Sequence, residues 1–130
     1  MQTSPRTAAQ LVADARQHIE NLTPDQVAAE LARGQVLLVD IREPHERVQN
    51  GSIAGAIHAP RGMLEFYADP ASAYHRPEFD PNRRTILYCA SGGRSALAVA
   101  SLQQLGYATV AHLDGGLKAW TASGREVSPA

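Results

Sequence analysis

The stretch TILYCASGGRSALAVASLQQL (residues 85–105) joins three sequence patterns in one segment. It begins with a short apolar run typical of a buried strand, which ends at Cys89, the only cysteine in the chain. Two glycines follow, and the residues from about Arg94 to Leu105 then predict a helix that ends at Gly106. This order predicts a strand, a tight turn and a helix, with Cys89 at the carboxyl end of a strand in an α/β domain.

Three further apolar runs predict the other strands of the same sheet. VLLVDI (36–41) is continuous rather than alternating, which is the pattern of a strand covered on both faces of a parallel sheet. AIHA (56–59) and VAHL (110–113) are shorter runs of the same kind. Helical segments are expected at 44–50, 94–105 and 117–122. Strands that alternate with helices predict an α/β fold with a mainly parallel central sheet, helices on both faces and right-handed crossovers.

The N-terminal part and the middle of the chain carry other patterns. Leu11, Ala15 and Ile19 form one modest apolar stripe, which predicts a helix packed on the outside of the domain. TPDQ (23–26) is a capping box with proline at the first helical position, so it predicts the start of a second helix that Gly34 ends. Residues 60–84 contain four prolines and little periodicity, so we expect a long irregular connection there.

The composition is that of an ordinary globular protein. The chain has 130 residues, of which 44% are apolar and 19% charged, with a formal net charge of −1, so we expect one domain and no nucleic-acid partner. No apolar stretch approaches the roughly 20 residues that a membrane span requires. MQTSPRTAAQ (1–10) lacks the basic start and the apolar segment of a signal peptide. We therefore expect a cytoplasmic protein that does not bind membranes.

The single cysteine is either an inert buried thiol or a reactive one, because one cysteine forms neither an internal disulfide nor a multi-thiolate zinc site. In an open α/β sheet, ligands bind beyond the carboxyl ends of the strands, where Cys89 is expected. The turn 90–93 contains two glycines, so its successive N–H groups can point inward, and the following helix N-terminus adds donors and a positive dipole end. These surroundings favour a thiolate nucleophile.

Two parts of the chain together resemble the rhodanese-like family. TILYCASGGRSALAVASLQQLGY followed by VAHLDGGLKAW is similar to the active-site half of that family, and VLLVDIREPHERVQNGSIAGAIHAP resembles its first signature segment. The resemblance covers about residues 23–124. Residues 1–22 are then expected to be an N-terminal tail with an extra helix packed on the domain, and residues 125–130 a C-terminal tail. One departure is GSIAGA, in which Ser52 and Ala54 stand where the family often has a histidine and a proline.

The resemblance implies a sulfurtransferase in which the cysteine carries a sulfane sulfur as a persulfide. Carried over to this chain, Cys89 is the sulfur carrier, and residues 90–94 complete its loop. In the hypothesis built on this resemblance, Arg94 attracts the anionic donor and the departing anion. The expected substrate-binding loop contains Ala90, Ser91, Gly92, Gly93 and Ser95. The implied partners are a small anionic donor such as thiosulfate, and cyanide or a cellular thiol, including a protein thiol, as the acceptor. No cofactor is expected.

Two other functions fit parts of the sequence. Cysteine phosphatases and some arsenate reductases also hold an anion in a loop between a cysteine and an arginine, but their spacing is C-x5-R. The spacing from Cys89 to Arg94 is C-x4-R, and the shorter loop suits one extra sulfur better than a tetrahedral phosphoryl group. A rhodanese-like binding or regulatory module is the other alternative, and the retained cysteine argues against it.

Three charged residues near predicted strand ends are further candidates for the rim of the site. Asp40 and Arg42 follow the first apolar strand, and we expect them mainly to hold neighbouring loops by hydrogen bonds. Arg61 follows another strand and is either a second positive charge for the donor or a solvated arginine. The five histidines show no metal-ligand spacing, since HERVQ (45–49) lacks the second histidine of H-E-x-x-H, so no metal site is predicted.

Overall fold

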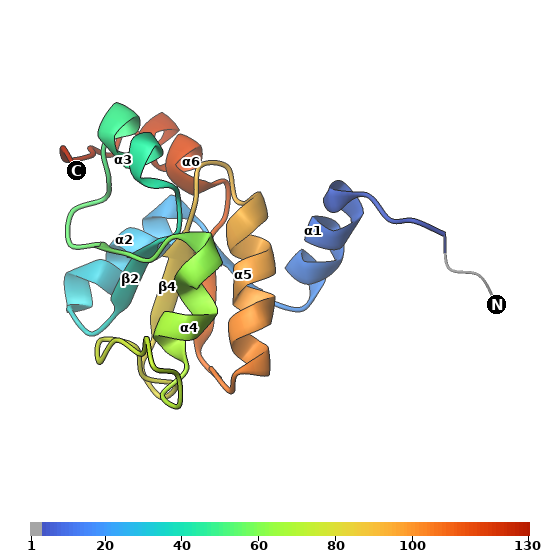
Figure 1. The fold of residues 1–130 in the computed structure, drawn as a ribbon. Helices are drawn as coiled ribbons and strands as arrows, with labels where there is room; N and C mark the ends of the chain where they lie inside the picture. Colours follow the sequence, from blue (N-terminus) through green and yellow to red (C-terminus); the bar gives the residue numbers. More distant parts are fainter. Residues whose placement is uncertain (1–3) are drawn as a thin grey trace.

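A five-stranded sheet forms the centre of the computed structural model, which describes residues 4–130 (Figure 1). Its strands are β1 (Glu20–Leu22), β2 (Leu37–Asp40), β3 (Ile57–His58), β4 (Thr85–Tyr88) and β5 (Val110–Leu113). The strand order is β1-β5-β4-β2-β3, and all neighbouring strands pair in parallel. The predicted α/β fold with a parallel central sheet is therefore confirmed, and the four predicted strands lie within the expected apolar runs.

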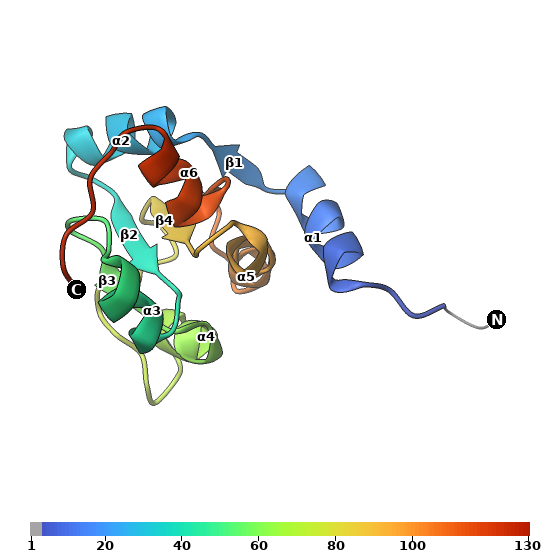
Figure 2. The same cartoon turned by 90° about the horizontal axis from the view of Figure 1, so that it is seen from above.

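Helices cover both faces of the sheet. They are α1 (Ala8–Gln17), α2 (Pro24–Arg33), α3 (Pro44–Asn50), the 3₁₀ helix η1 (Arg61–Met63), α4 (Leu64–Ala68), α5 (Gly93–Gln104) and α6 (Gly116–Ala122). Figure 2 shows α2 and α6 on one face and α4 and α5 on the other. Each face has its own apolar core, with Val39 and Leu87 on the α5 side and Leu38 and Ile86 on the α2 side. Because both faces are covered, β2, β4 and β5 are buried along their whole length, which explains their continuous apolar runs.

The helix boundary signals operate as predicted at α2. The Thr23 hydroxyl accepts a hydrogen bond from the Gln26 backbone N–H at 3.2 Å, and the Gln26 side chain accepts one from the Thr23 backbone N–H at 2.9 Å. Gly34 ends the helix with φ 78°, a left-handed conformation that favours glycine. Both ends of α2 are thus fixed by local interactions.

Two elements differ from the sequence-based expectations. Residues 60–84 are not irregular throughout, because they contain η1 and α4, and α4 buries Leu64 and Ala68 against the α5 side of the core. The Tyr107 hydroxyl donates a hydrogen bond to the Ala68 carbonyl at 2.8 Å and ties this helix to the end of α5. The other element is β1, a short edge strand between α1 and α2. Both elements are too short to show a helical or alternating period.

The helix α1 and the segment after α6 contact the rest of the domain in different ways. α1 lies beside α5 at the outer edge of the molecule (Figures 1 and 2), and β1 pairs with β5. Near the other end, Ser52 and Ser128 exchange two backbone hydrogen bonds of 2.8 Å, so part of the expected C-terminal tail is held against the residues that follow α3. Within residues 4–130, no helix has the length and apolar character needed to cross a membrane.

Candidate active site

Cys89 lies directly after β4 at the carboxyl edge of the sheet, as its position in the sequence predicts. Its side chain belongs to the α5 side of the core, and the residue is only 1% exposed. The sulfur accepts hydrogen bonds from the backbone N–H of Gly92 at 3.2 Å and of Ser95 at 3.4 Å. Two donors from the first turn of α5 and the preceding loop therefore point at the sulfur, an arrangement that stabilises negative charge there.

The loop owes its shape to close backbone packing against the start of α6. Gly92 has φ 100°, and a Cβ atom there would lie 3.0 Å from the Gly115 nitrogen. A Cβ atom at Gly116 would lie 2.5 Å from the Cys89 carbonyl oxygen, so only glycine allows this approach. The backbone N–H groups of Leu117 and Lys118 donate to the carbonyls of Cys89 and Ala90 at 2.9 and 3.0 Å. Gly115 and Gly116, at the start of α6, thus support the cysteine loop directly.

Arg94 lies in the first turn of α5 but does not present a free positive charge. Its guanidinium donates two hydrogen bonds of 2.8 Å to the carboxylate of Glu46 on α3. These bonds lower the pKa of Glu46 to about 2 and raise that of Arg94. Glu46 was not identified from the sequence, because only the tertiary fold brings α3 to α5. The sole local signal was its place three residues after Glu43, where it forms a capping box.

The paired Glu46 predicts an acid-sensitive contribution to stability. Its pKa is lowered on folding from an ordinary value near 4.5, so the contribution is complete above about pH 4.5 and is lost as the pH falls towards 2. We expect Glu46→Gln to be less stable than the wild type at pH 7, and the difference to shrink near pH 2.5. Urea unfolding at both pH values measures it, and Glu126→Gln is a control. A difference that stays constant or grows on acidification would contradict the assignment.

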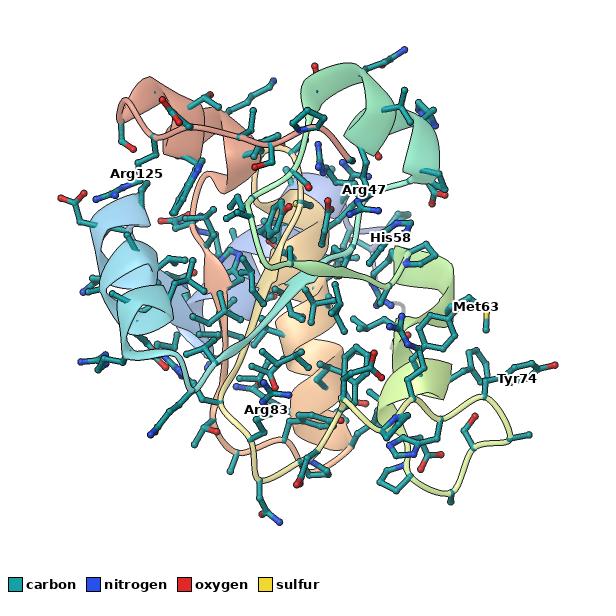
Figure 3. All side chains as sticks on the ribbon, turned by 90° about the vertical axis from the view of Figure 1, so that its left-hand side faces the viewer. Arg47, His58, Met63, Tyr74, Arg83 and Arg125 are labelled. Carbon is teal, nitrogen blue, oxygen red and sulfur yellow. The ribbon has the colours of Figure 1, made fainter. Side chains whose placement is uncertain are left out.

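Asp40, at the end of β2, and Arg42 form a buried ion pair. Both are at most 1% exposed, and Arg42 donates to the Asp40 carboxylate from its backbone N–H at 3.0 Å and from its guanidinium at 2.9 and 2.7 Å. Arg47 and the Tyr88 hydroxyl donate to the same carboxylate at 3.1 Å, and Figure 3 shows Arg47 below α3, toward the sheet. Burial alone would raise the pKa of Asp40, but the bonds and charge of Arg42 outweigh it and lower that pKa.

Arg61 takes part in a separate contact. It begins η1, and its guanidinium donates to the carboxylate of Glu65 on α4 at 2.8 and 2.9 Å. Glu65 also accepts a hydrogen bond from the Ser101 hydroxyl of α5 at 2.6 Å. The Arg61 charge is therefore balanced locally, within a contact between α4 and α5.

A cavity of about 240 Å³ lies beside the cysteine loop. Its lining residues are Arg42, Asn50, Ala90, Leu117, Lys118 and Thr121. Lys118 is exposed, is the only lysine in the chain and was not singled out from the sequence. Among residues 4–130, no three His, Cys, Asp or Glu side chains come together as a metal site requires. The structure therefore brings Cys89, its loop and a cationic cavity wall together, and places Arg61 in another contact.

Comparisons with known proteins agree with this fold. Residues 23–123 match the rhodanese-like domain family. A sulfurtransferase from Allochromatium vinosum is 39% identical over 89 residues, which are 68% of this chain and 75% of that protein. The thiosulfate sulfurtransferase GlpE of Stutzerimonas stutzeri is 33% identical over 101 residues, covering 78% of this chain and 84% of that protein.

A solved structure extends the similarity to nearly the whole chain. It is a protein of unknown function from Rhodopseudomonas palustris, described as a possible tyrosine phosphatase. It has a TM-score of 0.90 and 38% identity to this chain, over 98% of both chains. The family match covers most of the sequence and contains the cysteine loop with its supporting glycines. The chain therefore belongs to the rhodanese-like domain family.

Proposed function

We propose that this protein is a sulfurtransferase that moves a sulfane sulfur from a small anionic donor such as thiosulfate to a thiophilic acceptor. The observation that supports this most is the position of the Cys89 sulfur, which receives two backbone N–H donors at the carboxyl edge of the sheet. The names of two relatives, sulfurtransferase and thiosulfate sulfurtransferase, support it further. We also propose that residues 23–124 are the catalytic domain, to which residues 1–22 and 125–130 are additions.

The reaction consists of two half-reactions on one sulfur atom. In the first, the Cys89 thiolate attacks the outer sulfur of thiosulfate, the donor S–S bond breaks, and sulfite leaves with the bonding electrons. In the second, cyanide or a thiolate attacks the outer sulfur of the persulfide, and Cys89 leaves as a thiolate. Both stages place negative charge on sulfur at the loop, where fixed N–H donors stabilise it without reorganisation.

The charges around the loop limit what Arg94 contributes to donor binding. Glu46 offsets much of its positive charge, so in this proposal Arg94 orients α3 against α5 as well as attracting the donor. Lys118 is a second cation, exposed in the wall of the cavity beside Ala90. We propose that it attracts the anionic donor and the departing sulfite. A cellular acceptor, including a protein thiol, would then approach the persulfide from the same side.

Steady-state kinetics with thiosulfate and cyanide test the proposed function. A persulfide intermediate requires ping-pong behaviour, so the double-reciprocal plots at several cyanide concentrations are expected to be parallel. Thiocyanate formation no faster than in buffer would contradict the enzymatic proposal and favour a binding or regulatory module. The assay uses the full chain, because residues 20–22 form the edge strand β1 of the sheet.

A phosphatase is the second candidate, because the similar structure from Rhodopseudomonas palustris is described as a possible one. The loop argues against it. The number of backbone N–H groups between the cysteine and the helix start determines the size of the anion cradle, and C-x4-R has one residue fewer than the phosphatase spacing. The wild type is therefore expected to leave p-nitrophenyl phosphate unhydrolysed.

Lengthening the loop tests this size argument. We expect an extra glycine between Gly93 and Arg94 to slow sulfur transfer by about a hundredfold or more, since it moves an N–H donor away from the persulfide. An extra glycine after Gly62, in η1, is a matched control for insertion itself, and circular dichroism checks the fold. If the folded loop variant transfers sulfur at the wild-type rate, loop length does not select sulfur over phosphate.

A further inference from the structure

A chain of polar groups leads from the Cys89 sulfur through the interior to the edge strand β1. The sulfur lies 3.5 Å from the Ser95 hydroxyl, and that hydroxyl lies 2.7 Å from Nδ1 of His112. Nε2 of His112 lies 2.7 Å from the side-chain oxygen of Asn21. Ser95 and His112 are both fully buried. Asn21 is the register partner of His112 in the β1–β5 pair and lies outside the family match at 23–123.

The bonds of Asn21 determine where His112 carries its proton. The Asn21 side-chain N–H groups donate to the carbonyls of Arg16 at 2.9 Å and Ile19 at 3.3 Å, so its oxygen faces the imidazole. An amide oxygen only accepts, and Nε2 of His112 must therefore be the donor. Burial lowers the pKa of His112 to about 4, so the ring is neutral at physiological pH and its Nδ1 is an acceptor.

This tautomer of His112 determines the direction in which the Ser95 hydroxyl donates its single proton. The hydroxyl has two acceptors other than sulfur, the His112 nitrogen at 2.7 Å and the Gly92 carbonyl at 3.3 Å, and the shorter bond is to His112. With its proton directed to His112, the Ser95 oxygen turns a lone pair toward Cys89. A thiol S–H can donate to that lone pair, whereas a thiolate would be repelled by it.

We propose that Asn21 and His112 are positioning residues that hold the Ser95 hydroxyl as an acceptor toward Cys89, so that this hydroxyl hydrogen-bonds the thiol and does not stabilise the thiolate. Ionisation breaks the S–H bond, passes the proton to solvent or buffer, and leaves the thiolate to the N–H donors of Gly92 and Ser95, without a donor from the Ser95 hydroxyl. The strand β1 therefore takes part in controlling the nucleophile. This inference rests on Cys89 being the reactive thiol of the proposed function, but not on the identity of the sulfur donor.

Other charged groups surround the two ends of this chain. Arg94 of α5 lies near Cys89 and is paired with Glu46 of α3. His112 is near Asp114, which directly follows β5 and favours protonation of the ring, and near Arg16 of α1, which opposes it. Arg94, Glu46, Asp114 and Arg16 are unchanged in the variants below, so differences between the variants report the orientation of the Ser95 hydroxyl.

The pH dependence of Cys89 alkylation by iodoacetamide, a neutral reagent, tests the proposal in the full chain. Without Asn21, His112 is free to carry its proton on Nδ1 and donate it to Ser95, whose hydroxyl then turns to the sulfur and stabilises the thiolate. We therefore expect Asn21→Ala to shift the midpoint of the pH–rate profile to lower pH by about one unit, and His112→Phe to shift it the same way. Ser101→Ala, which removes another α5 hydroxyl, is expected to leave the midpoint unchanged.

A double substitution and a spectrum make the test specific. In a Ser95→Ala background, Asn21→Ala is expected to have no further effect on the midpoint. Histidine ¹⁵N shifts in the wild type are expected to show the Nε2–H tautomer of His112. The proposal would be overturned if the midpoint moved to higher pH, did not move, or moved equally in the Ser95→Ala background. An Nδ1–H tautomer of His112 in the wild type would also overturn it. If the midpoints shift as expected but no sulfur is transferred, the proposed function fails and this inference stands.

Discussion

Replacing Cys89 by serine is expected to reduce sulfur transfer by a factor of at least about a thousand, the scale seen when a covalent nucleophile is removed. The physical reason is that a serine hydroxyl is not ionised at neutral pH and forms no persulfide. The fold is expected to remain, because the change replaces one small atom and the hydroxyl can accept the N–H groups of Gly92 and Ser95. Thiocyanate formation and circular dichroism measure the two properties.

Ser91→Ala is the matched control for this prediction. Ser91 belongs to the predicted substrate-binding loop, but the donors to the sulfur are backbone N–H groups that this substitution keeps, and the Ser91 side chain is exposed. The variant is therefore expected to keep activity within a few-fold of the wild type. Wild-type rates in Cys89→Ser would show that another group carries the sulfur. A variant that is inactive because it is unfolded would be recognised by its spectrum, and Cys89→Ala would then provide the test.

The second large effect is expected at Asp40, whose removal leaves the guanidinium of Arg42 buried without its counter-charge. Breaking a buried pair in this way costs about 3 to 5 kcal/mol, so Asp40→Ala is expected to lower the melting temperature by on the order of 10 °C or more. The variant also loses the acceptor for Arg47 and Tyr88. Urea unfolding gives the free energy of unfolding directly.

Arg47→Ala separates the buried pair from its partly exposed neighbour. The Arg47 side chain is 21% exposed, and its bond to Asp40 leaves the Arg42 pair in place, so the expected loss is about 1 kcal/mol or less. Equal losses for the two variants, or a loss below about 1 kcal/mol for Asp40→Ala, would show that the Asp40 cluster does not hold the loops together.

The sequence was informative wherever local chemistry determined the structure. The continuous apolar runs predicted four of the five strands because both faces of the sheet are covered, and the Thr23 capping box predicted where α2 begins. The position of Cys89 at a strand end followed from the same patterns. β1 and α4 could not be predicted, since three and five residues are too few for a period and their packing depends on β5 and α5.

The arrangement of charge at the site depends on contacts between distant segments. The pairing of Arg94 with Glu46 joins residues 48 positions apart, and that of Arg16 with Asp114 joins residues 98 positions apart. The bond between Asn21 and His112 spans 91 positions. A single sequence shows the chemical type of each group but not which groups meet. It therefore indicated a cationic role for Arg94 and showed neither its carboxylate partner nor the polar chain behind Cys89.

Mass spectrometry of the intact chain after incubation with thiosulfate tests the central claim most directly. The wild type is expected to gain one sulfur atom, which digestion places on the peptide containing Cys89 and which cyanide removes with formation of thiocyanate. Cys89→Ser is expected to gain nothing. An unmodified wild-type mass after incubation, or an added sulfur that cyanide does not remove, would contradict the persulfide mechanism.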